Sequence, residues 1–155
     1  MIVLGVDPGL RYSGFAVVKH EKKSNVIACG YLPLSSSDST AVRVHQFHDF
    51  FEKLIIDYSI SLLVLEQPFL GKNVQSFLRL GYLRGIVQLL SARHNLELRE
   101  YSPSQIKSAV TGFGGADKEQ VARVIYQLFP YIPPQKRSDV TDAIAIAICG
   151  AWKRG

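Results

Sequence analysis

The strongest constraint on how this chain folds is a short apolar run in its middle, Leu62-Leu63-Val64-Leu65, which ends at Glu66. The run shows no alternation of apolar and polar residues, which is typical of a strand buried on both faces. Such a strand needs a layer of helices on each side of its sheet. The chain therefore predicts an α/β fold with this run as the central strand.

Apolar periodicity and turn residues predict the remaining elements. Three strands joined by short turns come first, and we expect an antiparallel meander because a parallel pair would need a long crossover. The order β-β-β-α-β-α-β-α-α-α predicts a mixed five-stranded sheet, the meander plus parallel strands, flanked by helices on both faces. No repeat or linker marks a second domain, so residues 1–155 are expected to form a single domain. The other expected strands are 2–6, 14–19, 26–34 and 96–101, and the expected helices are 39–58, 74–93, 103–112, 117–129 and 138–152.

Composition favours an anionic partner without deciding it. The chain has 18 Lys and Arg against 13 Asp and Glu, and a pI of about 9.3, yet many intracellular proteins are mildly basic. No apolar run approaches the roughly 18 residues that span a bilayer, and the N-terminus does not read as a signal peptide. Cys29 and Cys149 lie in apolar surroundings without a C-x-x-C pattern. Reduced thiols in a cytoplasmic protein are therefore expected.

Four acidic residues stand where a surface carboxylate is not expected. Asp7 and Glu66 each close a buried strand, and parallel neighbours would bring them together at the C-terminal edge of the sheet. Asp139 and Asp142 lie three residues apart in the first turn of the last helix and share one face. The rest of that helix is almost wholly apolar, so it packs on the sheet and carries both acids to the same edge.

This set of acids predicts a site for a hard cation. An acid in a first turn is usually only a helix cap, but capping does not explain all four, and we expect them to lack salt-bridge partners. Oxygen ligands suit Mg²⁺, with Mn²⁺ as a substitute, and the absence of a nearby His or Cys argues against structural zinc. Two ions about 4 Å apart activate water and stabilise the leaving oxygen during attack on a phosphodiester. A metal-dependent nuclease is therefore expected.

The turn after Asp7 raises an alternative. Pro8 restricts one φ angle and Gly9 permits a tight reversal. The same Asp-x-Gly hairpin binds phosphate in sugar kinases and actin-like ATPases. Those enzymes close two domains around a nucleotide, whereas this chain has 155 residues and no second Gly-rich phosphate loop. Nucleotide hydrolysis is therefore disfavoured.

These residues resemble the RuvC family of Holliday-junction resolvases. Asp7 in Ile-Val-Leu-Gly-Val-Asp-Pro-Gly, Glu66 in Leu-Glu-Gln-Pro-Phe, and Asp139 with Asp142 in Ser-Asp-Val-Thr-Asp-Ala-Ile-Ala match the family's four catalytic carboxylates. The resemblance runs from Ile2 to about Ala151. Further matching segments are Gly71-Lys72-Asn73-Val74, Leu80-Gly81-Tyr82-Leu83-Arg84-Gly85 and Ala116-Asp117-Lys118.

The resemblance implies an RNase H-like fold and Mg²⁺-dependent cleavage of four-way DNA junctions by paired symmetric nicks. It also implies a homodimer that acts with the RuvA and RuvB branch-migration proteins. Lys107 and Lys118 match family lysines near the scissile phosphate, and Phe69 matches an aromatic residue that stacks on an unpaired base. Without the resemblance, solvated lysines and a core phenylalanine would be the simpler interpretation. Two features depart from the pattern: Pro68 precedes the aromatic residue, and the chain ends at Gly155 without the polar tail of longer members.

Two surfaces are predicted for partners. Gly81 and Gly85 each cost about 1 kcal/mol relative to Ala in a helix, which indicates that another backbone passes close to helix 74–93, either in a second copy or within the monomer. Contacts to DNA phosphates are expected from basic residues around the carboxylate loops. The complete set of expected DNA-binding residues is Phe69, Lys72, Asn73, Arg79, Lys107, Lys118, Arg123, Lys136 and Arg137.

Two other functions stay open at this point. One is an RNase H-like nuclease that acts on a different nucleic acid, such as a ribosomal RNA precursor. The other is a junction-binding protein without catalysis, which would lack one of the four carboxylates. A substrate panel distinguishes the first alternative, and metal titration the second.

Overall fold

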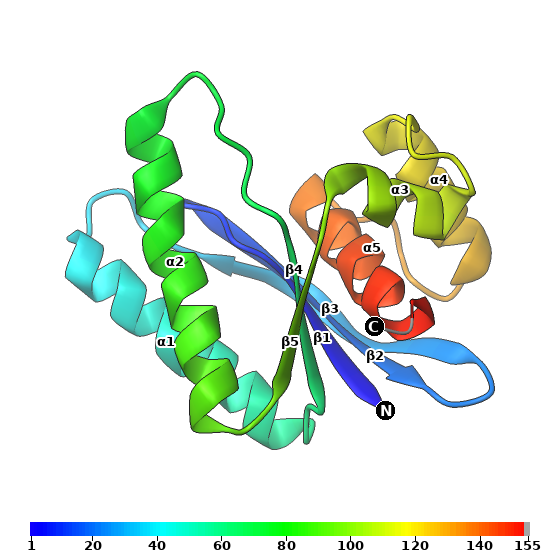
Figure 1. Ribbon diagram of the computed structural model, residues 1–155, viewed down its shortest axis with the longest axis horizontal. Coiled ribbons are helices and arrows are strands. Elements are labelled where there is room, and N and C mark those ends of the chain that lie inside the picture. Colours follow the sequence, from blue (N-terminus) through cyan, green and yellow to red (C-terminus); the bar gives the residue numbers. More distant parts are fainter. Residues whose placement is uncertain (154–155) are drawn as a thin grey trace.

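A twisted mixed sheet runs through the middle of the molecule (Figure 1). The computed structural model describes residues 1–153, so Gly155 lies outside the described residues. Within that range the sheet has five strands in the order β3-β2-β1-β4-β5. The strands are β1 (Ile2–Asp7), β2 (Tyr12–His20), β3 (Ser24–Pro33), β4 (Leu62–Glu66) and β5 (Glu97–Tyr101).

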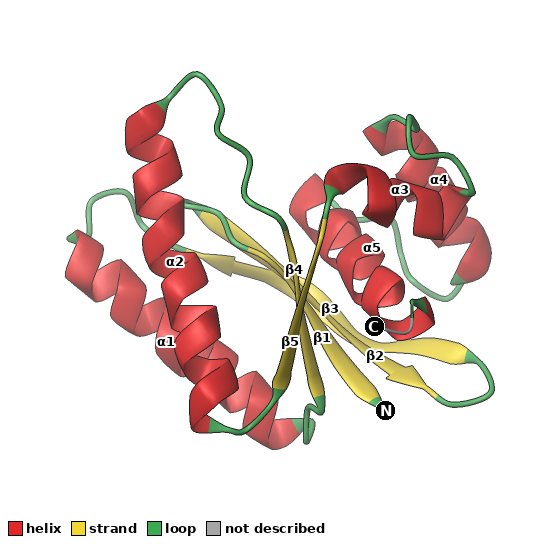
Figure 2. Ribbon diagram, in the orientation of Figure 1, coloured by secondary structure: helices red, strands yellow, loops and turns green. Residues whose placement is uncertain are grey.

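Helices cover both faces of this sheet, as expected (Figure 2). One layer is formed by α1 and α2, and the other by α3, α4 and α5, of which α5 lies directly against the strands. None of the helices in residues 1–153 combines the length and apolar character needed to cross a bilayer. The helices are α1 (Thr40–Asp57), α2 (Val74–Arg93), α3 (Pro103–Thr111), α4 (Lys118–Leu128) and α5 (Ser138–Trp152).

The central strand is buried on both faces, as its composition predicts. Val64 packs into the apolar cluster on the α5 side, whereas Leu63 and Leu65 pack into the cluster beneath α1 and α2. β4 pairs in parallel with β1, with Val6 opposite Leu65. Asp7 and Glu66 therefore end neighbouring strands at one edge of the sheet. The other pairings confirm the mixed topology: β1–β2 and β2–β3 are antiparallel, and β4–β5 is parallel.

Local capping signals place the helices that border this edge. Ser102 caps α3 with Pro103 at the first helical position, and Gly112 ends the helix with φ of 78°. The Asp117 carboxylate accepts the backbone N–H of Gln120 at 2.8 Å in a capping box. The sequence carries the signal for both helix starts, a Ser-Pro pair at 102–103 and an Asp-x-x-Gln pattern at 117–120. The second cap makes Lys118 the first residue of α4.

Three glycines allow α5 to lie very close to the sheet. A Cβ on Gly14 would lie 2.0 Å from the carbonyl oxygen of Asp139, and one on Gly5 would lie 2.5 Å from that of Ala143. At the other end of the helix, a Cβ on Gly150 would meet a Val64 methyl at 2.3 Å. Because Gly14 is paired with Asp7 across β1 and β2, this packing sets the first turn of α5 beside the end of β1.

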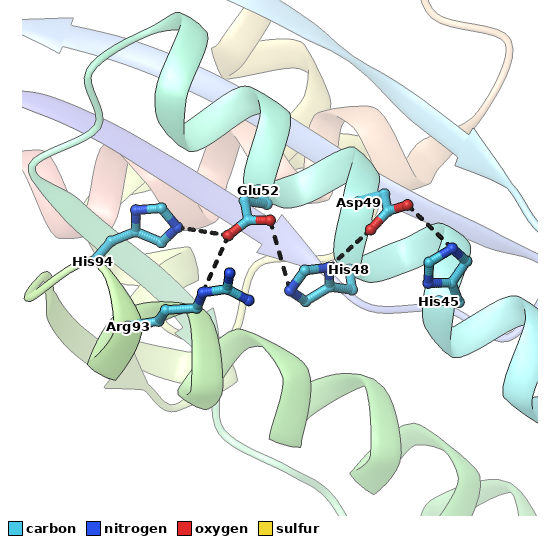
Figure 3. Close-up of polar contacts among 6 residues, drawn as sticks. All are labelled: His45, His48, Asp49, Glu52, Arg93 and His94. Atoms are coloured by element: carbon cyan, nitrogen blue, oxygen red, sulfur yellow. Dashed lines mark hydrogen bonds and ion pairs between the residues drawn. The ribbon is translucent and has the colours of Figure 1, made fainter.

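A polar cluster joins α1 to the end of α2 (Figure 3). Glu52 Oε1 lies 3.0 Å from His94 Nε2 and 3.6 Å from Arg93 Nε, and the hydrogen bond with His94 lowers the pKa of Glu52. His48 lies 3.8 Å from the other oxygen of Glu52. His94 is the C-cap residue of α2, and β5 begins three residues later, so the cluster connects α1 to the segment that leads into β5.

We predict that Gly14→Ala destabilises the protein by about 1–3 kcal/mol. The added methyl group meets the Asp139 carbonyl, so α5 has to move away from the sheet. Gly71→Ala is the control, because no atom of the described residues lies within 4 Å of its Cβ position, and its expected change is within about 0.5 kcal/mol. Urea denaturation followed by circular dichroism measures both. Equal stability of the two variants would contradict the close packing of α5.

Candidate active site

Four carboxylates from three elements meet at the C-terminal edge of the sheet. Asp7 ends β1, Glu66 ends β4, and Asp139 and Asp142 lie in the first turn of α5. Burial, followed by repulsion from the other three acids, raises the pKa of Asp7 to about 7. Burial and the charge of Asp142 also raise the pKa of Glu66. Residues remote in the sequence thus share one electrostatic environment.

Three grooves adjoin these acids. The first, of about 440 Å³, is lined by Asp7 and Glu66 and extends to Phe69 and α2. A smaller groove of about 80 Å³ lies between Glu66 and Asp142. The third, of about 630 Å³, runs along the turn after Asp7 and reaches Asp139. An extended ligand fits such an open surface better than a small enclosed molecule.

The expectation that the acids lack salt-bridge partners is wrong for the two on α5. Lys118 Nζ lies 2.9 Å from Asp142 Oδ2, and Arg137 Nε lies 2.9 Å from Asp139 Oδ2. The hydrogen bond that Lys118 donates to Asp142 raises the pKa of Lys118. In this arrangement, no three His, Cys, Asp or Glu side chains within residues 1–153 are grouped to hold a metal ion.

The donor set itself fits a hard divalent cation. It consists of carboxylate oxygens alone, which Mg²⁺ and Mn²⁺ prefer. Burial, followed by repulsion from nearby acids, raises the pKa of Asp7 and of Glu66, so the charged forms of both acids require positive compensation. Bound cations would supply that compensation. The four acids thus have the chemistry of metal ligands, and in the described structure their side chains are not yet grouped within ligation range of one ion.

Comparison with known proteins then identifies the family. The family model "Crossover junction endodeoxyribonuclease RuvC" matches residues 3–150. The chain belongs to the RuvC family. The RuvC of Pelodictyon phaeoclathratiforme is 44% identical, over 100% of this chain and 82% of that protein, and the RuvC of Alkaliphilus oremlandii is 35% identical, over 97% and 93%. The structure of T. thermophilus RuvC in complex with Holliday junction substrate superimposes with a TM-score of 0.91 at 25% identity, over 98% of this chain and 93% of that one.

These matches confirm the RuvC resemblance, the RNase H-like fold and the nuclease class expected from the sequence. Solved RuvC structures match the whole mixed sheet with its two helical layers. The nucleotide-hydrolysing alternative raised by the turn after Asp7 finds no support among the family assignments. In this member of the RuvC family, the turn holds an acidic residue at the end of β1.

A hydrogen-bonded reversal holds Asp7 in place. The buried Ser13 hydroxyl accepts the backbone N–H of Gly9 and donates to its carbonyl oxygen, both at 3.0 Å. A Cβ on Gly9 would lie 2.0 Å from the Tyr12 carbonyl oxygen, so the turn requires glycine. The sequence identified Gly9 but not Ser13. The signal in the sequence for the contact between Gly9 and Ser13 was their four-residue spacing.

Arg84 is a second residue that the sequence analysis did not assign to the site. Its guanidinium donates to the backbone carbonyl of Glu66 at 2.6 Å and pairs with Glu100 at 2.7 Å. It therefore connects α2 to the ends of β4 and β5. The sequence signal for Arg84 was its position between Leu80 and Val87 on the apolar stripe of α2, because a cation among apolar side chains needs polar partners.

Several residues with expected roles lie beside the carboxylates. Lys107 and Lys118 line the small groove with Glu66 and Asp142. Phe69 lines the first groove and is 81% exposed, so the interpretation of it as a core residue is wrong. Arg137 lines the third groove with Asp139.

The other expected DNA contacts lie elsewhere on the surface. Arg79 faces a separate hollow between α1 and α2. Asn73 caps α2, because its side chain accepts the N–H of Ser76 at 3.1 Å. Lys72, Arg123 and Lys136 are exposed and are not among the described residues that line the three grooves.

We predict that Asp7 makes the metal-free protein less stable as pH rises. Its folded-state pKa of about 7 exceeds the ordinary 3.8, so folding retains a proton that the unfolded chain releases. This stabilisation is complete below pH 3.8 and is lost as pH rises through 7. Asp7→Asn removes the ionisation. Between about pH 5 and pH 8, wild type should lose about 2 kcal/mol relative to this variant.

Urea denaturation in EDTA across this pH range measures the difference. Asp57→Asn, a change to an exposed acid paired with Lys53 on α1, is the control and should keep the wild-type pH dependence. Parallel pH profiles for wild type and Asp7→Asn would show that Asp7 is not a buried, repelled carboxylate.

Proposed function

We propose that this RuvC family member is a structure-selective endonuclease that resolves four-way (Holliday) junctions by paired symmetric nicks. The reaction is metal-dependent hydrolysis of a phosphodiester bond. The proposal is carried by the convergence of Asp7, Glu66, Asp139 and Asp142 at the meeting point of open grooves. It is supported by the likeness to a T. thermophilus RuvC solved with a Holliday junction substrate.

In this proposal the four acids hold Mg²⁺, or Mn²⁺ in its place, as two ions. The bound ions supply positive charge for the attacking and leaving oxygens of an in-line displacement. The chain contributes a site that needs this charge, because burial and repulsion among the acids raise the pKa of Asp7. Asp7 and Glu66 are held by strand ends, and Asp139 and Asp142 by a packed helix, so the ligands are set on rigid elements.

Basic and aromatic side chains position the DNA. Lys107 and Lys118, which line one groove with Glu66 and Asp142, offset the charge that develops on the scissile phosphate. The exposed ring of Phe69 offers a stacking surface for an unpaired base. Further phosphate contacts come from Lys72, Asn73, Arg79, Arg123, Lys136 and Arg137.

The outer face of α2 forms a homodimer interface in this proposal. Leu78, Tyr82 and Leu89 are each more than half exposed along one stripe of the helix. Gly81 and Gly85 have no atom of the described residues within 4 Å of their Cβ positions, so close packing within the monomer does not explain them. A two-fold dimer of this kind presents two active sites to a substrate with two-fold symmetry.

The dimer acts with the RuvA and RuvB branch-migration proteins, as the family resemblance implies. The proposed compartment is the cytoplasm. Its reducing conditions suit the two thiols, Cys29 and Cys149, which are unpaired in the described structure.

Cleavage of a labelled synthetic four-way junction tests the catalytic assignment. We predict that Asp7→Asn retains junction binding but lowers the cleavage rate by on the order of 10²–10³-fold with Mg²⁺ present, because a metal ligand and its charge are lost. Asp57→Asn on α1 should cleave as wild type does. Paired nicks formed by Asp7→Asn at the wild-type rate would refute the assignment.

The same assay distinguishes the alternative substrates. Linear duplex DNA and structured RNA are offered beside the four-way junction, and the product ends are mapped. Symmetric nicks confined to the junction are expected. A preference for RNA or linear duplex would instead favour the related nuclease function, and the absence of both Mn²⁺ binding and cleavage would favour a binding protein.

We also predict that Tyr82→Glu converts the dimer to monomers, because a buried, unpaired charge opposes association. Sedimentation velocity should show at least roughly a tenfold weaker self-association. Ile56→Glu, which changes a 62% exposed residue on α1, is the control and should leave the dimer intact. A dimer that survives Tyr82→Glu would exclude the outer face of α2 as its interface.

A further inference from the structure

Arg137 is held between an aromatic face and one of the site carboxylates. Its guanidinium carbon lies 3.4 Å from the centroid of the Tyr12 ring. Its Nε donates to Asp139 Oδ2 at 2.9 Å. Tyr31 packs edge-on against Tyr12, with ring centroids 5.7 Å apart, and lies 5.9 Å from the guanidinium. Two strands thus provide an aromatic support that directs Arg137 onto Asp139.

Helix electrostatics do not explain an arginine at this position. Arg137 is the N-cap residue of α5, and its side chain makes no capping hydrogen bond within the described structure. Helix N-termini favour Ser, Thr, Asp or Asn as caps and disfavour positive charge. The cation therefore lies where the helix alone would destabilise it, and its compensating contacts are Tyr12 and Asp139.

The two acids of α5 are thus both paired with cations from the chain. Lys118 contacts Asp142 as Arg137 contacts Asp139. The two cations differ in what supports them. Arg137 lies over the Tyr12 ring, whereas among the described residues no aromatic ring supports the Lys118 ammonium. The Lys118 side chain is 72% exposed, against 35% for Arg137. A long exposed lysine is easily displaced. A stacked, half-buried arginine is held more firmly.

We propose that Arg137, seated on Tyr12, is a resident counter-ion that occupies Asp139 and competes with the divalent cation for it. The inference rests on the proposed function in taking Asp139 as a metal ligand. A divalent ion at that carboxylate would lie within a few ångströms of the guanidinium, and the two positive charges repel. The contact between Arg137 and Asp139 Oδ2 therefore opposes metal binding at this carboxylate. Tyr12 is the positioning residue that sets how strongly Arg137 resists displacement from Asp139 by the metal ion.

Arg137 already lines a groove that can use its charge. The groove is lined by Arg137 and Asp139 together with Gly9, Arg11 and Tyr12. Released from the carboxylate, the guanidinium adds to the charge of Arg11 on this surface, where an anionic ligand would be attracted. Metal loading and the electrostatic state of the groove are thereby coupled.

Direct titration of the metal-free, full-length protein with Mn²⁺ alone tests the proposal, by calorimetry or electron paramagnetic resonance. Arg137→Gln should bind Mn²⁺ about three- to tenfold more tightly than wild type. Tyr12→Leu should bind more tightly as well, because the ring is lost while the net charge is unchanged. Tyr12→Phe keeps the ring and should match wild type. Arg137→Lys keeps the charge without the planar group and should fall between wild type and Arg137→Gln.

Lys136→Gln controls for net charge. It removes one positive charge at the neighbouring exposed position, and the described structure gives Lys136 no hydrogen bond or ion pair. Its Mn²⁺ affinity should change less than about twofold. Structural damage weakens a metal site, so tighter binding cannot arise from misfolding. Thermal unfolding in EDTA verifies that each variant is folded.

Two results would overturn the proposal. Equal affinity of Tyr12→Leu and Tyr12→Phe would show that the aromatic support has no role. Equal gains in Mn²⁺ affinity for Arg137→Gln and Lys136→Gln would show that the effect comes from net charge alone. A separate titration of Asp139→Asn distinguishes failure of the proposed function: if it binds Mn²⁺ as wild type does, Asp139 is not a ligand, and the metal assignment falls together with this inference.

Discussion

Repulsion among four carboxylates at one sheet edge is the constraint that the rest of the structure has to meet. The acids stay together because α5 packs against the strands through backbone contacts that only glycine permits, at Gly5, Gly14 and Gly150. These contacts hold the first turn of the helix beside the end of β1. The energy of packing an almost wholly apolar helix thus offsets the cost of gathering like charges.

The protein compensates these charges unequally. The helix acids Asp139 and Asp142 are paired with Arg137 and Lys118, whereas the strand acid Asp7 keeps a pKa of about 7. A site fully neutralised by its own side chains would have little affinity for metal, and one without any internal cation would be more strained. The observed arrangement lies between these limits. Tyr12 and Tyr31 affect the balance between them because they hold Arg137, one of the two cations, in place.

Much of this architecture could be predicted because its causes are local. The unalternating run before Glu66 required helices on both faces, and the caps at Ser102 and Asp117 marked two helix starts that the structure confirms. Parallel pairing then brought Asp7 to Glu66. The prediction that failed was the absence of salt-bridge partners. Arg137 and Lys118 were expected to contact DNA phosphates. Which carboxylate each of them pairs with depends on side-chain directions that appear only after packing.

The sequence by itself determined the order of elements, the strand ends that carry acids and the spacing that sets two acids on one helix face. These follow from periodicity and capping, which act within a few residues. Tertiary structure alone decided which cation meets which carboxylate, that Arg84 secures the end of β4, and that Gly81 and Gly85 face outward. These depend on distances between elements, and such distances are set by how whole helices pack on the sheet.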